Sequence, residues 1–133
     1  MIRIIAVGSV KNKAIGDEIR ALTKKLGNVE IFETKEFSKR PIKEILRLEA
    51  SEIKKALRPS FVVCFDLKGK QTTDLSGLLA DHEDVTFIIG GSHGLAAEIT
   101  KKCDRRVSIS GMTYPHMLFR AMVLDMIMQN HKL

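Results

Sequence analysis

The sequence has few of the residues that form metal centres or covalent cross-links. It contains two cysteines, Cys64 and Cys103, and four histidines that are scattered at positions 82, 93, 116 and 131. No two of these histidines have a spacing typical of metal ligands, so we expect no bound metal, and two cysteines cannot form a disulfide framework. Cys64 lies inside the apolar run FVVCF, where we expect a small buried side chain.

Long hydrophobic runs are also missing. No apolar stretch approaches the roughly 20 residues that cross a bilayer, so we expect no membrane-spanning helix. The opening residues, MIRIIAVGSV, lack a cleavage pattern of small residues and are more typical of a first strand than of a signal peptide. We therefore expect a cytoplasmic protein.

The composition is typical of one soluble globular domain. Hydrophobic residues make up 44% of the 133 residues and charged residues 29%, so we expect residues 1–133 to form a single domain. The formal net charge is +6, and residues 1–60 hold 14 Lys or Arg against 8 Asp or Glu, while the rest holds 8 of each. A basic half of this kind is typical of a protein that binds a polyanion such as nucleic acid. It is equally typical of a lysine-rich surface that keeps a protein in solution.

Apolar strands and amphipathic helices alternate along the chain. This alternation predicts an α/β fold with a mostly parallel sheet and helices on both faces. The expected strands are residues 2–7, 29–34, 60–67, 85–89 and 105–109, with residues 68–71 as a turn. The expected helices are residues 11–25, 41–58, 74–81, a short one from about residue 95, and 116–130.

A glycine-rich turn follows the strand VTFII. It reads Gly90-Gly91-Ser92-His93-Gly94, and in open α/β sheets ligands bind beyond the carboxyl ends of the strands, so this turn predicts a ligand crevice. The turn is not a Walker loop, because the Lys-Ser/Thr pair is absent. It is not a dinucleotide fingerprint either, because its spacing and its late position do not fit. A tight connection without a ligand is the simplest alternative.

A second loop, SGMTYP, joins the strand RRVSI to the last helix. Pro115 suits the first turn of that helix, where its missing N–H costs nothing. The helix, HMLFRAMVLDMIMQN, is apolar on most of its circumference, so we expect the sheet to cover one face and a second copy of the chain the other. Its methionines are expected to fill the core and that interface.

These features together resemble a known family. A late strand ending in IGGSHGL, a basic-flanked strand and the loop SGMTYPH before an arginine-bearing helix are similar to the α/β-knotted (SPOUT) methyltransferases. Within them the sequence is most similar to the RlmH family of large-subunit ribosomal RNA pseudouridine methyltransferases. The segments IIAVGSVKNK and FVVCFDLKGKQTTDLSGLL add to this resemblance, which covers nearly the whole chain.

The resemblance implies a fold, a cofactor and a partner. It implies a C-terminal trefoil knot, a homodimer and S-adenosylmethionine bound by the knot loops, with ribosomal RNA, in the large subunit or the assembled ribosome, as the substrate. The expected reaction is methylation of N3 of a pseudouridine in 23S ribosomal RNA. The cofactor contacts that the resemblance implies are Phe65, Gly90, Ile109, Ser110, Gly111, Met112, Thr113 and Tyr114.

One part of the family pattern is missing. Family members carry a Tyr-Arg pair in the last helix and a Tyr-His near the carboxyl terminus, whereas this chain has Met128-Gln129 and ends in His131-Lys132-Leu133. Either the sequence is truncated or the tail that faces the target is absent. The resemblance therefore supports cofactor binding more fully than positioning of the target.

Methyl transfer requires alignment of the reactants and removal of a proton from the N3 imide. His116 is the candidate base, because a neutral imidazole accepts a proton near physiological pH, and a capping or packing histidine is the alternative. Arg120 shares its helix face and is the candidate for holding a phosphate or a base carbonyl, with a surface ion pair as the alternative. Arg105 and Arg106 are candidates for contact with RNA backbone, with a solvated pair as the equal alternative. Asp66 is a weaker candidate for contact with the cofactor or target.

Two other functions fit the same residues. A nucleotide-binding Rossmann-like enzyme would use the glycine turn to hold a phosphate, although the full fingerprint is missing. A basic RNA-binding module without catalysis would bind RNA in a salt-dependent manner and would gain no stability from S-adenosylmethionine.

Overall fold

The computed structural model describes residues 1–71, 74–108 and 116–130, and its centre is a five-stranded parallel sheet in the order β2-β1-β4-β3-β5. The strands are β1 (Ile2–Val7), β2 (Val29–Thr34), β3 (Phe61–Gln71), β4 (Val85–Ile89) and β5 (Arg105–Ser108). The helices are α1 (Lys13–Leu26), α2 (Ile42–Ala56), α3 (Ser76–Asp81), α4 (Ala97–Thr100) and α5 (His116–Asn130). The α/β fold with a parallel sheet, predicted from the alternation of elements, is confirmed.

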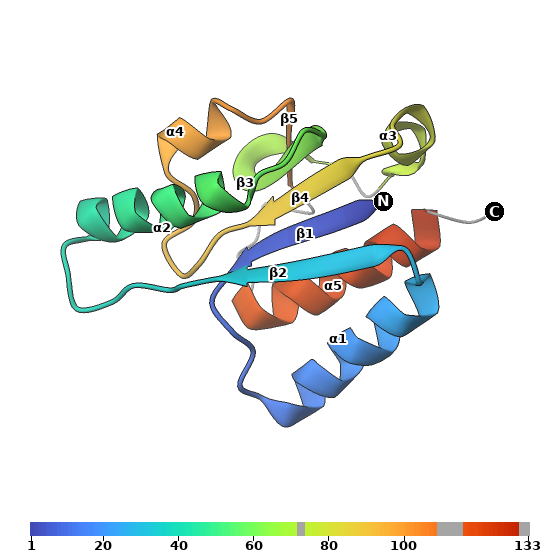
Figure 1. Ribbon diagram of the computed structural model, residues 1–133, viewed down its shortest axis with the longest axis horizontal. Coiled ribbons are helices and arrows are strands. Elements are labelled where there is room, and N and C mark those ends of the chain that lie inside the picture. Colours follow the sequence, from blue (N-terminus) through green and yellow to red (C-terminus); the bar gives the residue numbers. More distant parts are fainter. Residues whose placement is uncertain (72–73, 109–115, 131–133) are drawn as a thin grey trace.

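Helices cover both faces of the sheet, as expected (Figure 1). α1 and α5 pack on one face and α2 and α4 on the other. Along the central strands the side chains alternate between the two cores: Ile4 and Phe87 face α1 and α5, while Ile5 and Ile88 face α2 and α4. None of these four is more than 1% exposed, which is why β1 and β4 are apolar throughout.

A side-chain cap and a glycine set the two ends of α1. The Asn12 side chain accepts a hydrogen bond from the Ile15 backbone N–H at 3.0 Å, which caps the first turn. At the other end Gly27 has φ 74°, and its N–H donates to the Thr23 carbonyl at 3.1 Å. The helix therefore stops at this glycine, because a side chain is disfavoured in this conformation with positive φ.

The coverage of α5 differs from the expectation. Val123, Leu124 and Ile127 are completely buried within one chain, and α1 packs along the same helix. The expectation that the sheet alone covers α5 in one chain is wrong, because it left out the neighbouring helix on the same face. Leu118 remains 42% exposed.

β3 is longer than expected. The strand continues to Gln71, so the predicted turn at residues 68–71 is wrong. Val107 of β5 pairs with Phe65 and again with Lys70, so the register of β3 shifts against β5 between these two residues. A Cβ atom on Gly69 would lie 2.6 Å from the Arg106 carbonyl carbon. Pairing with β5 therefore overrides the local turn propensity of Lys-Gly-Lys, and the glycine makes the close approach possible.

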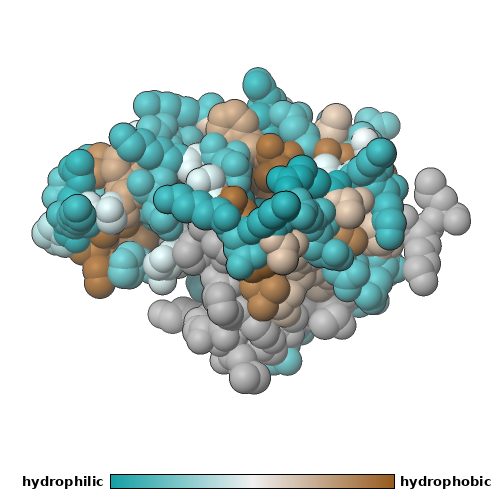
Figure 2. Space-filling view, turned by 90° about the horizontal axis from the view of Figure 1, so that it is seen from below, coloured by the Kyte–Doolittle hydropathy of each residue, from teal (hydrophilic) through white to brown (hydrophobic). Residues whose placement is uncertain are grey.

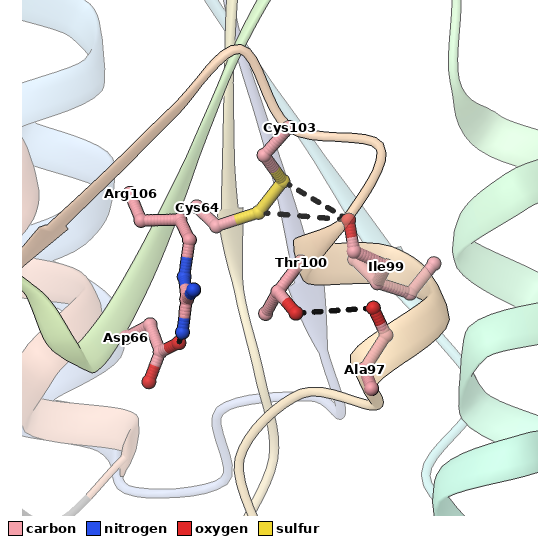
Figure 3. Close-up of polar contacts among 7 residues, drawn as sticks. All are labelled: Cys64, Asp66, Ala97, Ile99, Thr100, Cys103 and Arg106. Carbon is pink, nitrogen blue, oxygen red and sulfur yellow. Dashed lines mark hydrogen bonds and ion pairs between the residues drawn. A yellow bond between two sulfur atoms is a disulfide. The ribbon is translucent and has the colours of Figure 1, made fainter.

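The two cysteines meet on the α2 and α4 side of the sheet (Figure 3). Cys64 is completely buried, as expected, and it forms a disulfide with Cys103, with Cα atoms 6.0 Å apart. The Ile99 carbonyl oxygen lies 3.9 Å from Sγ of Cys64 and 3.2 Å from Sγ of Cys103, where it can accept from either thiol when the pair is reduced. The sequence did not indicate this pair, because the residues are 39 positions apart and become neighbours only through the pairing of β3 with β5.

Replacement of a central core residue tests this packing. Phe87 is completely buried and lies 5.8 Å from Phe65, measured between ring centroids. Phe87→Ala should lower the free energy of unfolding by about 3–5 kcal/mol in urea titrations, because it leaves a cavity in the core. Ile42→Ala is the control, since Ile42 is 55% exposed and its loss should cost less than about 0.5 kcal/mol. Equal losses for both variants would contradict the assigned core.

Candidate functional site

The loops that follow β1, β2 and β4 lie at one edge of the sheet (Figure 1), because parallel strands place their carboxyl ends together. The register pairs Cys64 of β3 with Ile88 of β4. The residues that follow, Phe65 and Ile89, are therefore neighbours, and Gly90 comes one position later. The structure thus places Phe65 and Gly90, two predicted cofactor contacts, on adjacent strands at this edge.

Phe65 is an almost completely buried aromatic ring near the carboxyl end of the sheet. Its side chain is 8% exposed and packs with Phe87 and, edge to face, with Phe119 at 5.4 Å between ring centroids. Phe119 belongs to α5, so the ring links the end of β3 to the last helix. An apolar ring held on two sides provides a rigid surface against which the flat base of a nucleoside can pack.

The glycine turn is tight in itself. A Cβ atom on Gly90 would lie 2.6 Å from the Gly94 carbonyl oxygen, and Gly94 has φ 79°. The Gly94 N–H donates to the Gly91 carbonyl at 3.1 Å and closes the turn. The turn geometry therefore requires these glycines whether or not a ligand is bound, and it presents backbone groups at the edge of the sheet.

Arg120 points into the protein. Its side chain is 1% exposed, and Nη2 donates to the carbonyls of Val7 at 3.3 Å and Gly8 at 3.0 Å. Nη1 bonds to Oε2 of Glu33 at 2.5 Å. Burial lowers the pKa of the Arg120 guanidinium from its ordinary value, and the Glu33 carboxylate opposes that shift. The guanidinium would have to exchange these bonds to contact RNA, and here it fastens α5 to β1 and β2.

Glu49 joins two of the loops. This residue of α2 is 4% exposed, and its Oε2 accepts a hydrogen bond from the Phe37 N–H at 3.1 Å. Its Oε1 would lie 3.4 Å from a Cβ atom on Gly91, so the carboxyl group sits between the loop after β2 and the glycine turn. Burial raises the pKa of the Glu49 carboxyl, the Phe37 N–H opposes this shift, Glu36 adds to it, and His93 also opposes it.

Sequence analysis missed Glu49 although a signal was present. Ile45, Glu49 and Ile53 follow one another at a spacing of four residues, which places them on one helix face, and both isoleucines are buried. A carboxylate on the apolar face of a helix needs hydrogen-bond partners. Glu33 was missed for a different reason, since it lies in an edge strand where polar residues are common.

The other predicted contact residues lie along β3 and β5. Arg106 forms an ion pair with Asp66, with Nε 3.0 Å from Oδ2 (Figure 3), and the Arg105 guanidinium lies 5.6 Å from the centre of the Phe61 ring. Residues 109–114, predicted to complete the cofactor site, lie outside the described residues. So does the His116 imidazole, although His116 begins α5 as expected.

A recess of about 500 Å³ lies between α1, β2 and α5. Arg20, Thr23, Lys24, Glu33 and Arg120 contribute its polar groups, and neither Phe65 nor Gly90 lines it. Among residues 1–71, 74–108 and 116–130, no three His, Cys, Asp or Glu side chains gather into a metal site. The helices in these same ranges are too short or too polar to cross a membrane.

Comparison with known proteins gives one consistent family. A family model described as "Predicted SPOUT methyltransferase" matches residues 1–133. The ribosomal RNA large subunit methyltransferase H of Caldicellulosiruptor saccharolyticus is 33% identical over 140 residues, covering 96% of this chain and 91% of that protein. The protein of the same name from Clostridium botulinum strain Langeland is 36% identical over 143 residues, covering 95% and 90%.

Solved structures show the same fold. A probable methyltransferase from Bordetella pertussis has a TM-score of 0.67 at 17% identity, covering 97% of this chain and 93% of that one. The SpoU methyltransferase AviRb from Streptomyces viridochromogenes, solved with AdoMet, has a TM-score of 0.52 at 16% identity, covering 96% and 56%. With the family match over residues 1–133 and the two relatives above 30% identity, these results show that the chain belongs to the SPOUT methyltransferase family.

Proposed function

We propose that the protein is an S-adenosylmethionine-dependent methyltransferase that modifies N3 of a pseudouridine in 23S ribosomal RNA. The observation that carries this proposal is the similarity to the large-subunit RNA methyltransferases, which extends over 96% of the chain at 33% identity. The geometry agrees with it, because an apolar ring and a backbone-lined glycine turn lie side by side where a parallel sheet binds ligands.

The described residues fit such a cofactor. Phe65 offers an apolar face for the adenine ring, and the turn at Gly90 offers backbone N–H and C=O groups for its polar edge. Residues 109–114 would complete the site. The bound cofactor supplies a methyl group on a positively charged sulfur, so the protein needs no further electrophile.

His116 has the role of general base in this proposal. Its imidazole would accept the proton of the N3 imide, and the imide nitrogen would take the methyl group as the bond between that carbon and the sulfonium sulfur breaks, with the sulfur leaving as a neutral thioether. Arg120 follows one helical turn later and holds α5 through the Val7 and Gly8 carbonyls, so it positions the first turn of that helix. We assign Arg120 this positioning role.

Family membership also supports a proposal for the partner and the location. We propose that the enzyme acts in the cytoplasm on the large subunit or the assembled ribosome, as a homodimer with a C-terminal trefoil knot. Leu118 supports the second copy, because it is a large apolar side chain on α5 that stays 42% exposed in one chain.

Cofactor selectivity and methyl transfer test the proposed activity. S-adenosylmethionine at about 100 times its dissociation constant should stabilise the protein by about 2.7 kcal/mol, whereas NAD and ATP should give no comparable shift in melting temperature. Labelled methyl groups should then be transferred to ribosomes that lack the modification. Stabilisation by NAD or ATP would favour the Rossmann-like enzyme, and RNA binding without methyl transfer would favour the non-catalytic module.

Removal of the proposed base should affect turnover and not cofactor affinity. His116→Ala should lower the single-turnover methyl-transfer rate by about 100-fold or more, because proton removal then depends on solvent. Calorimetry should show nearly unchanged affinity for S-adenosylmethionine. His82→Ala is the matched control, since His82 stacks on Phe61 before β4 begins, at the other edge of the sheet. Full activity of the His116 variant would exclude it as the base.

A charge at position 118 should separate the two copies. Leu118→Asp should convert the dimer to a monomer in light-scattering measurements, because a carboxylate is costly to bury in an apolar interface. The same substitution at the exposed Phe32 is the control and should leave the dimer intact. A monomeric parent protein, or a dimer unaffected by the Leu118 substitution, would contradict the proposed interface.

A further inference from the structure

We propose that the loop between β2 and α2 is an RNA-contact surface, in which Lys35 and Arg40 bind phosphates and Phe37 stacks against a base. We call residues 35–41 the basic loop. The inference rests on the proposed RNA substrate and adds where that substrate is held. No residue of this loop belongs to the predicted cofactor or catalytic set.

The basic loop projects from the end of the molecule that carries the glycine turn. It leaves the carboxyl end of β2 and returns in the first turn of α2, at the left of Figure 1. Figure 2 shows this end, again at the left, as mostly hydrophilic with a few hydrophobic side chains. Lys35, Lys39, Arg40 and the following Lys43 are all exposed, and within 35–43 Glu36 is the one acidic residue. This local excess of positive charge suits a polyanion.

The Phe37 ring lies close to two of these cations. The Nζ atom of Lys35 is 5.2 Å from the centre of the phenyl ring, and Cζ of Arg40 is 5.7 Å from it. The ring is only half-buried. A partly exposed aromatic ring flanked by cations is the arrangement that binds single-stranded nucleic acid, because the ring stacks on a base while the cations contact the neighbouring phosphates.

Arg40 can exchange its partner Glu44 for a phosphate. Its Nη1 lies 3.4 Å from the Glu44 carboxylate, and both side chains are more than a third exposed. Exposed ion pairs of this type contribute little to stability. A phosphate can therefore replace Glu44 at small cost.

The basic loop is connected through Glu49 to the glycine turn. The Phe37 N–H is bonded to Glu49, whose other oxygen lies beside Gly91 of the glycine turn. Lys39 has φ 58°, a left-handed conformation that a lysine adopts only when its surroundings hold it there. RNA held by this loop would therefore lie close to the turn that we assign to the cofactor.

The test compares two charge-matched double variants. Lys35→Ala/Arg40→Ala should weaken binding to ribosomes lacking the modification by about tenfold at physiological salt, and should lower the slope of log affinity against log salt by about two. Lys24→Ala/Lys25→Ala removes the same charge from the exposed last turn of α1 and should change affinity by less than twofold. Equal losses in both variants, or no loss in the first, would overturn the proposal.

A second pair of variants tests the stacking role of Phe37. Phe37→Leu should weaken ribosome binding by at least about fivefold without changing the salt slope, because stacking involves no counterion release. Phe32→Leu changes an exposed ring that the Arg3 guanidinium contacts on β2, and it should leave the affinity unchanged. Equal effects of these two variants would exclude a specific contact at Phe37.

Cofactor affinity, oligomeric state, lipid binding and methyl transfer distinguish this surface from the enzyme activity and from other partners. Affinity for S-adenosylmethionine should be unchanged in the loop variants, and so should the oligomeric state by light scattering. A monomer produced by the loop variants would instead identify the loop as an interface between copies, and binding of the parent protein to anionic lipid vesicles as tightly as to ribosomes would identify a membrane surface. Either result would overturn the RNA surface.

A parent protein that binds ribosomes through this loop but transfers no methyl group would support the RNA surface and refute the proposed function.

Discussion

The guanidinium of Arg120 joins the last helix of the chain to its first two strands. It bonds to the carbonyls with which β1 ends and to the Glu33 carboxylate of β2, and it is almost completely buried. A buried charge that loses its partners costs about 3–5 kcal/mol, so α5 cannot shift from this position without a large penalty. Since α5 also places Phe119 against Phe65, the same helix position sets the packing at the end of β3.

The carboxyl edge of the sheet therefore combines two kinds of contact. Beneath it, apolar side chains from both faces fill the space between the parallel strands. At its rim, Arg120 donates to the Gly8 carbonyl and Glu49 accepts from the Phe37 N–H. Backbone polar groups are costly to bury without partners, and these two side chains supply them where regular pairing ends. The glycine turn lies beside both Val7 and Glu49, since a Cβ atom on Gly91 would lie 3.1 Å from the first side chain and 3.4 Å from the second.

The sequence was most informative where burial alone determines structure. β1, β2, β4 and α5 begin and end as expected, because β1 and β4 are continuous apolar runs, β2 begins with alternating apolar and polar residues, and α5 is a long apolar segment that follows Pro115. It was less informative where distant partners decide the outcome. β3 extends beyond Leu67 because β5 pairs with it, α4 is a single turn, and Glu49 acquires its role only when two loops converge on it. The predicted pair Phe65 and Gly90 was brought together, whereas the position of Arg120 depends on carbonyls more than 110 residues away.

The bond between Cys64 and Cys103 has a topological consequence for the middle of the chain. It closes a ring that contains α3, β4, the glycine turn and α4, so the backbone between these two residues has no free end. A protease that nicks the chain anywhere inside this ring leaves both fragments covalently attached. Under oxidising conditions the strand that leads into the glycine turn then remains tethered to its neighbours after a single cut.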